Sequence, residues 1–343
     1  MGTVTLKDLA ANLGLSITTV SRALAGYGDV AEATRRRVQE AAAEMGYVPD
    51  ATARRLRTGR TDTIGFVIPT SGPRFSDPFF SELLAGIGNE AARHNYDLLV
   101  STRPPGTPEE EATYRRLVES HLVDGLLVVR TRIEDRRIAY LAETGFPFVA
   151  FGRSDLDVDF PYVDEDGVQG LTLVVEHLLD QGHRRLAYLS APQDLMFSFY
   201  RRRGLETALQ RYGLELPAEC DIIGDLTQRG GFRAMNQLLD LPAPPTAVIA
   251  CNDLMALGAI SAAQKRGLTV GRDVAVTGFD DIPLAEHSHP PLTTVRQPIY
   301  DIGRRICNML IRLVRGESLT ERHILLKPEL VIRESSSTNR ERG

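Results

Sequence analysis

The feature of this sequence that most restricts its fold is an alternation of short apolar runs with helical segments from residue 63 onward. The runs are rich in Val, Ile, Leu and Phe, and they fall into two sets. Strands are predicted at residues 63–68, 97–101, 124–130 and 146–151, and again at 184–190, 220–224, 246–251 and 274–279. Helices are predicted near residues 79–95, 109–121, 134–144, 167–182, 197–213, 228–239 and 253–266. Such alternation is typical of parallel sheets that are covered by helices on both faces.

Two sets of strands and helices predict two lobes. In doubly wound sheets, ligands bind beyond the carboxyl ends of the strands. For two facing lobes, this edge becomes the wall of a cleft between them. We therefore expect a two-lobed α/β body, similar to periplasmic binding proteins, with a ligand site in the cleft.

The residues before this alternation predict a separate all-α head. Apolar residues recur at helical spacing in residues 6–14, 17–25 and 32–46. The first two segments are joined by a tight turn that contains Gly14, and the third is long enough to cover them. This arrangement is typical of a helix-turn-helix domain.

The second helix, within "GLSITTVSRALAG" (14–26), carries an unusual number of hydrogen-bonding side chains. Ser16 stands at an N-cap position and Gly26 where the helix should stop, while Val20 and Leu24 can face a core. The remaining polar side chains would then face phosphates and base edges in a DNA groove. The alternative is an amphipathic helix whose polar face meets only water.

The charge of the chain is divided unevenly along its length. Residues 1–60 hold nine Lys and Arg against six Asp and Glu, a net charge of +3, whereas the whole chain has a net charge of −5. The rest of the chain therefore carries −8. A basic head on an acidic body indicates that the head alone meets a polyanion.

A basic segment, residues 47–63, joins the head to the body. Pro49 should end the third helix, and Leu56 stands alone among arginines. Either this segment is a solvated linker, or it folds on DNA with its arginines on phosphates and Leu56 wedged into the minor groove. The lone leucine favours the second interpretation.

Several classes of protein are disfavoured. No run of about 18 apolar residues predicts a membrane span, and the N-terminus lacks a secretory pattern, so we expect a cytoplasmic protein. The cysteines, Cys220, Cys251 and Cys307, are isolated and fit core thiols better than metal ligands. We expect no metal and no cofactor.

Enzyme motifs are also weak or missing. "GIGNEA" (86–91) satisfies the GxGxxA pattern of dinucleotide-binding proteins, but it follows a predicted helix where the fingerprint requires a strand. The sequence contains no lysine-bearing phosphate loop, HExxH or GxSxG motif. We therefore expect a protein without catalytic residues.

Five ordered motifs resemble the lactose-repressor/galactose-repressor (LacI/GalR) family of transcriptional regulators. They are "VTLKDLAANLGLSITTVSRALAG", "TRRRVQEAAAEMGYVPDATARRLRTGRT", "CNDLMALGAI", "VAVTGFDDIPLAEHSHPPLTTVRQP" and "LLKPELVIRES". The resemblance runs from Thr3 to about Ser335. It implies a repressor that binds a palindromic operator as a homodimer, with its DNA affinity controlled by a small molecule in the cleft.

The resemblance also implies which head residues contact DNA. Ile17, Thr18 and Arg22 would read bases, and Leu56 would open a central base step. Further contacts, to phosphates and at the edges of the head, would come from Thr5, Ser16, Thr19, Ser21, Thr34 and Ala53. Two residues depart from the family pattern: Ala25 stands where asparagine is common, and Ala31 replaces a serine cap of the third helix.

The same resemblance points to residues of the cleft. Arg201 matches a ligand-binding arginine, and Asn252 and Asp280 match positions that bond ligand hydroxyls, although they could be a helix cap and a turn residue. The other candidates are Asp77, Phe79, Phe80, Arg153 and Gln297. One of the two phenylalanines could instead belong to the core, and Asp166 fits a helix cap better than a ligand contact.

Acids and amides beside aromatic rings suit a neutral polyol, so we expect a saccharide, such as an α-glucoside or another disaccharide. A purine-type effector is the alternative ligand. A periplasmic-type sugar-binding protein is the alternative function, and DNA affinity of the intact chain separates the two. Induction and co-repression by the ligand are both compatible with the sequence. No leucine heptad follows Ser335, which favours a homodimer over a tetramer built by a C-terminal coil.

The predicted boundaries follow from these patterns. The head covers residues 1–48, and the hinge and linker cover 49–61. The first lobe is expected at about 62–162 and 294–322, the second at about 163–293 and 323–335, and a tail at 336–343.

Overall fold

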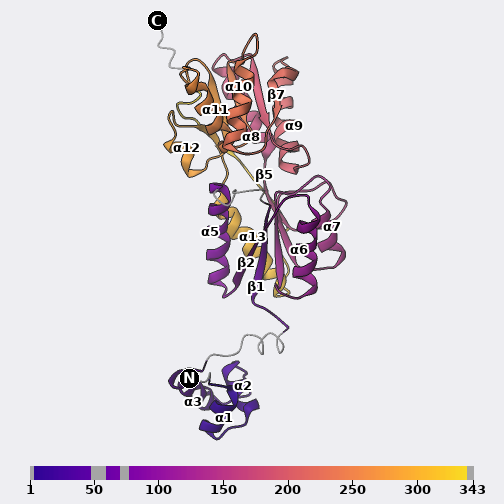
Figure 1. Ribbon diagram of the computed structural model, residues 1–343. Helices are drawn as coiled ribbons and strands as arrows, with labels where there is room; N and C mark the ends of the chain where they lie inside the picture. Colours follow the sequence, from indigo (N-terminus) through magenta and orange to yellow (C-terminus); the bar gives the residue numbers. More distant parts are fainter. Residues whose placement is uncertain (1–3, 48–58, 70–76, 338–343) are drawn as a thin grey trace. The chain divides into compact units, whose positions relative to one another are not determined.

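The computed structural model describes residues 4–47, 59–69 and 77–337. The chain divides into two compact units, residues 1–61 and 62–343 (Figure 1). The first unit contains the predicted head, and the second contains both predicted lobes. Ala53 and Leu56, two of the predicted DNA contacts, lie outside the described residues.

The head contains the three predicted helices, each ending one or two residues earlier than expected. They are α1 (Leu6–Leu13), α2 (Ile17–Leu24) and α3 (Glu32–Glu44). Leu9, Val20 and Val38, one from each helix, are fully buried in a shared small core. Such a small core leaves the outer side of α2 free of packing.

Side chains of the head fix where its helices begin. Thr5 and Asp8 form a capping box at the start of α1, and the Ser16 hydroxyl accepts the Thr19 amide 3.0 Å away at the start of α2. Ala31 makes no side-chain hydrogen bond at the start of α3, as its departure from the family pattern predicts. Loss of such a cap costs about 1 kcal/mol.

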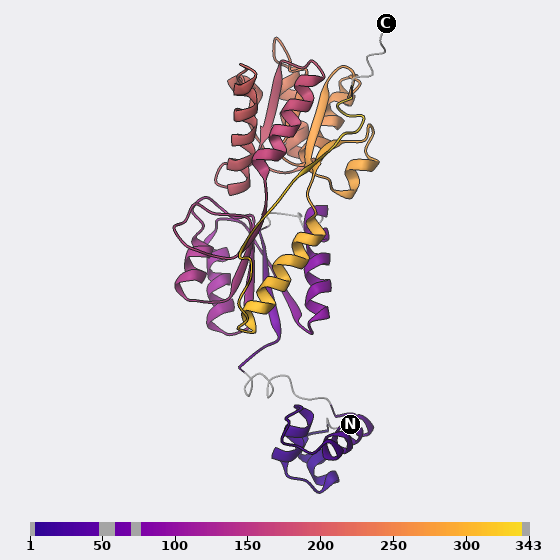
Figure 2. The same cartoon turned by 180° about the vertical axis from the view of Figure 1, so that it is seen from behind.

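The first lobe is a six-stranded parallel sheet in the order β11-β5-β4-β3-β1-β2. Its strands are β1 (Thr63–Pro69), β2 (Asp97–Arg103), β3 (Gly125–Val129), β4 (Phe148–Phe151), β5 (Tyr162–Glu165) and β11 (His323–Leu326). One face is covered by α5 (Pro78–Arg93) and α13 (Ile299–Val314), and the other by α6 (Pro108–Glu119) and α7 (Arg136–Glu143) (Figures 1 and 2). The sequence analysis did not identify β5, β11 or α13.

The second lobe repeats this plan with the order β12-β10-β9-β8-β6-β7, in which only β12 is antiparallel to its neighbour. Its strands are β6 (Leu186–Ser190), β7 (Asp221–Ile223), β8 (Ala247–Ala250), β9 (Ala275–Asp280), β10 (Thr293–Arg296) and β12 (Glu329–Val331). Its helices are α8 (Gly167–Asp180), α9 (Met196–Arg211), α10 (Gln228–Leu239), α11 (Asp253–Lys265) and α12 (Pro283–His287). Helix α8 packs beside α9, and α10 beside α11.

The strands that pair in each sheet show that the predicted lobe boundaries were wrong at three strands. All of β5 and β11 belong to the first lobe, although residues 163–165 and 323–326 were assigned to the second. Strand β10 belongs to the second lobe, although it was assigned almost wholly to the first. The chain therefore crosses between the lobes after β5, after β10 and between β11 and β12.

The predicted tail also begins too early. Ser336 is fully buried, and its hydroxyl hydrogen-bonds Thr293 Oγ1 at 2.7 Å and the His177 ring at 2.8 Å. These bonds fasten the end of the described chain to the second lobe.

Within the described residues, no helix has the length and apolar character needed to cross a membrane. The same residues contain no cluster of three or more His, Cys, Asp or Glu side chains that could hold a metal ion. The three cysteines are buried and free, as their isolation in the sequence predicts.

Candidate functional site

Helix α2 presents a buried face and a polar face, as its sequence predicts. Val20 and Ala23 are fully buried, whereas Ile17 is 48% exposed at the N-terminal end of the helix. Thr18 is exposed beside it. Ile17 and Thr18, two of the predicted base readers, are therefore accessible at the start of this helix.

The other predicted DNA contacts of the head differ in the hydrogen bonds and burial of their side chains. The Ser16 and Thr19 hydroxyls lie 2.8 Å apart, and the Thr5 hydroxyl donates to Asp8 at 2.6 Å. Ser21 and Thr34 are half-buried on α2 and α3. These hydroxyls therefore stabilise the starts of α1 and α2.

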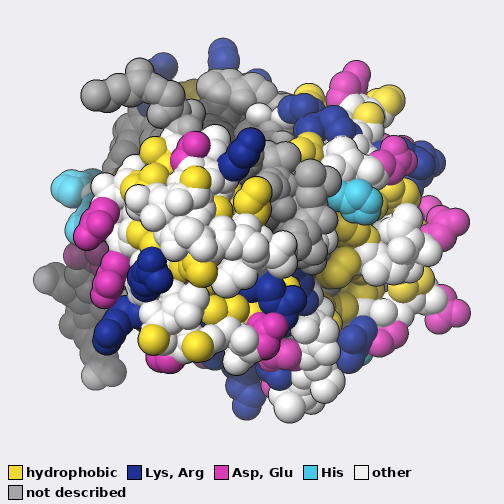
Figure 3. All heavy atoms as spheres, turned by 90° about the horizontal axis from the view of Figure 1, so that it is seen from below, with side chains coloured by type: hydrophobic (Ala, Val, Ile, Leu, Met, Phe, Trp, Pro, Cys, Tyr) yellow, Lys and Arg dark blue, Asp and Glu magenta, His cyan; other side chains and the backbone are white. Residues whose placement is uncertain are grey.

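The surface seen in Figure 3 does not carry basic groups alone. On the face drawn there, Lys and Arg side chains alternate with acidic, apolar and uncharged ones among the described residues. Residues 4–47, which form the three helices of the head, hold five Lys and Arg against five Asp and Glu. The excess positive charge of residues 1–60 therefore comes from the segment that follows these helices.

In the second unit, a pocket lies between the carboxyl ends of the two sheets and has a volume of about 50 Å³. The first lobe contributes residues at the start of α5 and at the ends of β3, β4 and β5, and the second contributes residues from α9 and from the ends of β7 to β10. The lining residues are Phe79, Arg130, Thr131, Phe151, Gly152, Asp164, Glu165, Phe197, Arg201, Leu226, Asn252, Asp280 and Gln297. The cleft therefore lies where doubly wound lobes bind ligands.

Arg201, 4% exposed, is the central cation of this pocket. Its Nη2 donates to Glu165 Oε1 at 2.9 Å and lies 3.6 Å from Asp280 Oδ1, and its Nη1 donates to the Cys251 carbonyl. The guanidinium carbon lies 3.5 Å from the centroid of the Phe279 ring. Arg201 is thus held by acids from both lobes and by a ring face.

Burial changes the protonation of the acids in the pocket. Removal from water raises the pKa of Glu165 to about 7, although Arg201 opposes this shift. The same cause raises the pKa of Asp280 well above its ordinary value. Near pH 7 the Glu165 carboxyl is therefore protonated in part of the molecules, and in that form it can donate as well as accept a hydrogen bond.

Three buried polar atoms of the lining residues have no hydrogen-bond partner among the described residues. They are Glu165 Oε2, Arg201 Nε and Gln297 Oε1. Buried polar atoms without partners are rare and costly, typically about 1–3 kcal/mol each. A ligand with hydroxyl groups could satisfy all three.

Aromatic rings form the apolar part of the pocket. The Phe79 and Phe151 rings are stacked with centroids 6.1 Å apart, and Phe197 lines the pocket from the second lobe. Flat apolar faces beside hydrogen-bonding groups match the alternating polar and apolar surfaces of a sugar ring.

Five of the eight predicted cleft residues line the pocket: Phe79, Arg201, Asn252, Asp280 and Gln297. Asn252 is also the N-cap of α11, where its side chain accepts the Met255 amide at 3.1 Å. It therefore both lines the pocket and caps a helix. Asp280 has a φ of +125°, a conformation that side chains rarely adopt. Strained backbone of this kind is frequent at functional sites.

The other three predicted residues lie outside the lining set. Asp77 is the N-cap of α5 and pairs with Arg130 Nη2 at 3.3 Å, while Phe80 is buried under the Arg130 guanidinium. Asp77 and Phe80 therefore contact Arg130, which lines the pocket, but do not line it themselves. Arg153 instead pairs with Asp164 at 2.6 Å and lies over the Tyr200 ring, along a separate pocket.

The sequence analysis missed eight lining residues: Arg130, Thr131, Gly152, Phe151, Asp164, Glu165, Phe197 and Leu226. Arg130 and Phe151 end predicted strands, so the carboxyl-end rule alone could have identified them. Glu165 ends β5, a strand that the sequence analysis did not predict. Asp166, in contrast, caps α8 as predicted, because its side chain accepts the Gln169 amide.

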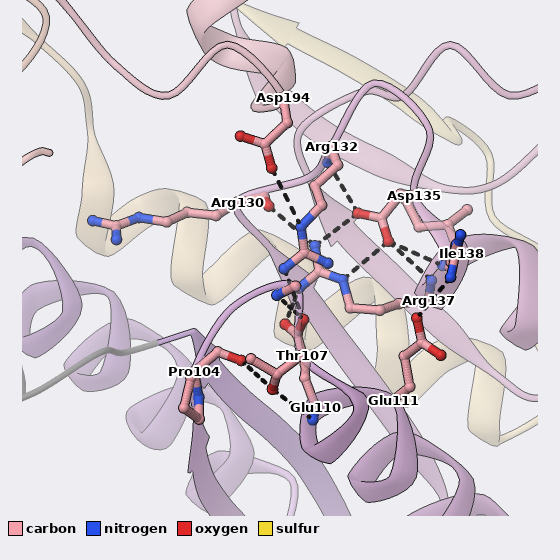
Figure 4. A network of polar contacts seen from close by, with 12 residues as sticks. Pro104, Thr107, Glu110, Glu111, Arg130, Arg132, Asp135, Arg137, Ile138 and Asp194 are labelled. Atoms are coloured by element: carbon pink, nitrogen blue, oxygen red, sulfur yellow. Dashed lines mark hydrogen bonds and ion pairs between the residues drawn. The ribbon is translucent and has the colours of Figure 1, made fainter. Parts of the chain in front are cut away.

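A buried network of charges supports Arg130 from behind (Figure 4). Arg137, 2% exposed, bonds Asp135 and Glu110 and also donates to the Arg130 carbonyl at 3.0 Å. Arg132, two residues after Arg130, pairs with Glu110 at 2.7 Å, and its Nε lies 3.9 Å from Asp194 Oδ2 of the second lobe. The network fixes the backbone that presents Arg130 to the pocket.

The raised pKa of Glu165 predicts an unusual pH dependence of stability. Between the ordinary value of 4.5 and about 7, the folded chain holds a proton on Glu165 that the unfolded chain releases. Stability contributed by this group is therefore full below pH 4.5 and is lost as the pH rises to about 7. We expect the unfolding midpoint to fall between pH 5 and pH 7.5, and Glu165→Gln to flatten this slope. A midpoint that rises over this range in both proteins would contradict the assignment.

Comparison with known proteins gives two matching family models. Residues 5–50 match the model described as bacterial regulatory proteins, lacI family, and residues 175–336 match a periplasmic binding protein-like domain. Among curated proteins, the HTH-type transcriptional regulator AglR of Rhizobium meliloti (strain 1021) is 40% identical over 338 residues, which cover 97% of this chain and 94% of that protein.

Two solved structures are similar over almost the whole chain. One is the transcriptional regulator CelR in complex with cellobiose, with a TM-score of 0.74, 34% identity and coverage of 97% of this chain and 99% of that one. The other is the lac repressor dimer bound to operator and the anti-inducer ONPF, with a TM-score of 0.87, 29% identity and coverage of 98% and 100%.

Proposed function

Because this chain belongs to the LacI family of bacterial regulatory proteins, we propose that it controls transcription through a palindromic operator whose occupancy depends on a saccharide in the cleft. The chain itself is a DNA-binding regulator and not an enzyme. We infer that it represses carbohydrate-utilisation genes as a homodimer, with a sugar as its effector, and that it is cytoplasmic and bound to the nucleoid.

The observation that supports a saccharide as the ligand is the combination of stacked rings with buried polar atoms that have no hydrogen-bond partner. Phe79 and Phe151 offer a flat apolar face, and Glu165, Arg201 and Gln297 each hold a polar atom without a partner. The two arginines of the lining are already paired with acids, so little net positive charge remains to attract a phosphate or carboxylate. A neutral polyol supplies hydroxyls for these atoms and brings no charge.

Relatives support the same class of ligand. The similar CelR structure contains cellobiose. The hydroxyl-rich edges and apolar ring faces of this disaccharide complement the polar groups and aromatic rings that line the pocket of the present chain. A disaccharide is therefore the first ligand to test.

The mechanism we infer couples the cleft to the head. Because the pocket is narrow and has walls from both lobes, a ligand that fills it must set the spacing of the lobes. In a homodimer, a change in lobe spacing would move the points where the two heads attach, and operator affinity would change with it. A ligand that favours the DNA-binding spacing would co-repress, and one that favours the other spacing would induce.

Thermal unfolding of the full chain against a ligand panel tests the saccharide. The panel contains cellobiose, other mono- and disaccharides, nucleobases and sugar phosphates. A ligand at a hundred times its Kd adds about 2.7 kcal/mol to the free energy of unfolding, which moves the midpoint by degrees. We expect a disaccharide to give this shift. A response confined to nucleobases or phosphates would contradict the saccharide and leave the DNA-binding function standing.

The periplasmic-type sugar-binding alternative makes a different prediction for DNA. A sugar-binding protein without regulatory function would select no duplex from a random-sequence pool. Enrichment of one palindromic sequence by the full chain would exclude this alternative.

A further inference from the structure

Arg22, the base reader implied by the family resemblance, is held along one edge by an acid. Its Nε donates to Asp29 Oδ1 at 3.3 Å and its Nη2 donates to Asp29 Oδ2. The carboxylate therefore binds the guanidinium with two parallel hydrogen bonds. The guanidinium carbon also lies 4.7 Å from the centroid of the Tyr27 ring. Paired bonds of this kind fix orientation as well as contributing energy.

The two hydrogen bonds to Asp29 leave the far end of the Arg22 guanidinium free. Among the described residues of the head, Arg22 Nη1 has no hydrogen-bond partner, and Nη2 keeps a second hydrogen. Guanine presents its O6 and N7 acceptors side by side in the major groove, and an arginine contacts them with two N–H groups. Arg22 can therefore keep Asp29 on one edge and bind a guanine with its end.

The segment that carries Asp29 is itself fixed. Arg35 of α3 donates to the Tyr27 and Val30 carbonyls at 3.0 and 3.4 Å, and Val30 packs against the core of the head. Gly26, with a φ of +74°, makes the turn that brings this segment back toward α2. Asp29 is thus a fixed support for Arg22.

We propose that Asp29 is a positioning residue that sets the sequence specificity of the head by aiming Arg22 at a guanine of the operator. The inference rests on the DNA-binding function and adds a second effect. The negative charge of Asp29 also cancels the attraction of Arg22 for phosphates, which lie on every sequence. Asp29 therefore restrains non-specific binding while supporting the specific contact.

The variant Asp29→Asn tests this proposal in the full chain. It keeps the size of the side chain but removes the charge and one of the two acceptors. The specific probe is the duplex that the wild-type chain enriches from a random-sequence pool, and the non-specific probe is a random-sequence duplex of equal length. Dissociation constants are measured for both over a range of salt concentrations.

We expect the ratio of specific to non-specific affinity to fall about tenfold or more in Asp29→Asn. The random duplex should bind several-fold more tightly with a steeper salt dependence, by up to about one unit of log–log slope per phosphate contacted. The enriched duplex should bind no more tightly than before. Asp29→Glu, which keeps the carboxylate, should restore part of the ratio.

Two controls separate positioning from a general charge effect. Glu44→Gln removes the same charge from an exposed position at the end of α3, and it should change both affinities alike. In an Arg22→Met background, Asp29→Asn should no longer change the ratio, because the side chain that it positions is gone. An Asp29 effect of equal size in that background would overturn the proposal.

Two other results have distinct meanings. If the wild-type chain enriches a sequence and Asp29→Asn keeps the wild-type ratio, the positioning role is wrong and the DNA-binding function stands. If the wild-type chain enriches no sequence, the proposed operator itself is wrong, and the role of Asp29 falls with it.

Discussion

Arg22→Ala is expected to abolish the preference of this protein for its operator without changing the affinity of the cleft for its ligand. One bidentate arginine–guanine contact contributes about 1–3 kcal/mol of discrimination. A palindromic operator contacted by two heads doubles this amount. The expected loss is therefore from about thirtyfold to more than ten-thousandfold in operator affinity.

The structure indicates that this loss would come from recognition and not from unfolding of the head. The Arg22 side chain is 44% exposed, and the core of the head is formed by other residues. The measurement is the Kd for the enriched duplex, with the ligand-induced shift of the unfolding midpoint as the control. Unchanged operator affinity in Arg22→Ala would contradict the assignment of α2 as the recognition helix.

Arg201→Ala is expected to have the largest effect on the second unit. This substitution leaves Glu165 and Asp280 buried beside each other without their cation. Removing one partner of a buried ion pair costs about 3–5 kcal/mol, part of which the remaining acids recover by binding protons. We expect a loss of this order in the free energy of unfolding and no ligand-induced shift at neutral pH.

Arg202→Ala is the matched control for this prediction. Arg202 is the next residue of α9 and carries the same charge, but it pairs with Asp221 at 2.8 Å away from the pocket and is partly exposed. Exposed pairs contribute up to about 1 kcal/mol, so this variant should remain stable and bind ligand. If Arg201→Ala fails to fold, Arg201→Lys keeps a cation at the site and tests binding alone. Equal loss of ligand binding in Arg201→Lys and Arg202→Ala would contradict a specific role for Arg201.

Part of the candidate site could be predicted from local sequence. Ser16, Asp166 and Asn252 precede helices and have side chains that cap them, so their places follow from neighbouring residues. The main strands of both lobes are apolar runs because parallel strands are buried on both faces. Asp280 and Gln297 entered the site through the family motif that contains them.

Other parts of the site depended on contacts between distant segments. Glu165 lies on β5, a four-residue strand whose polar sequence gives little local signal, and it meets Arg201 only because the two lobes face each other. Arg153 and Arg130 both follow strands of the first lobe. Only the acids that each arginine contacts decide that Arg130 lines the pocket and Arg153 does not.

The sequence by itself determined the three helices of the head, the alternating strands and helices of both lobes, and the polar face of α2. These features arise from hydrophobic periodicity and helix capping, which act between residues close in the chain. Only the tertiary structure decided where the chain crosses between the lobes, which acids surround Arg201, and that Asp29 holds Arg22. Pairing of strands and burial of charges depend on segments that folding brings together, and the local sequence does not encode which partner each will meet.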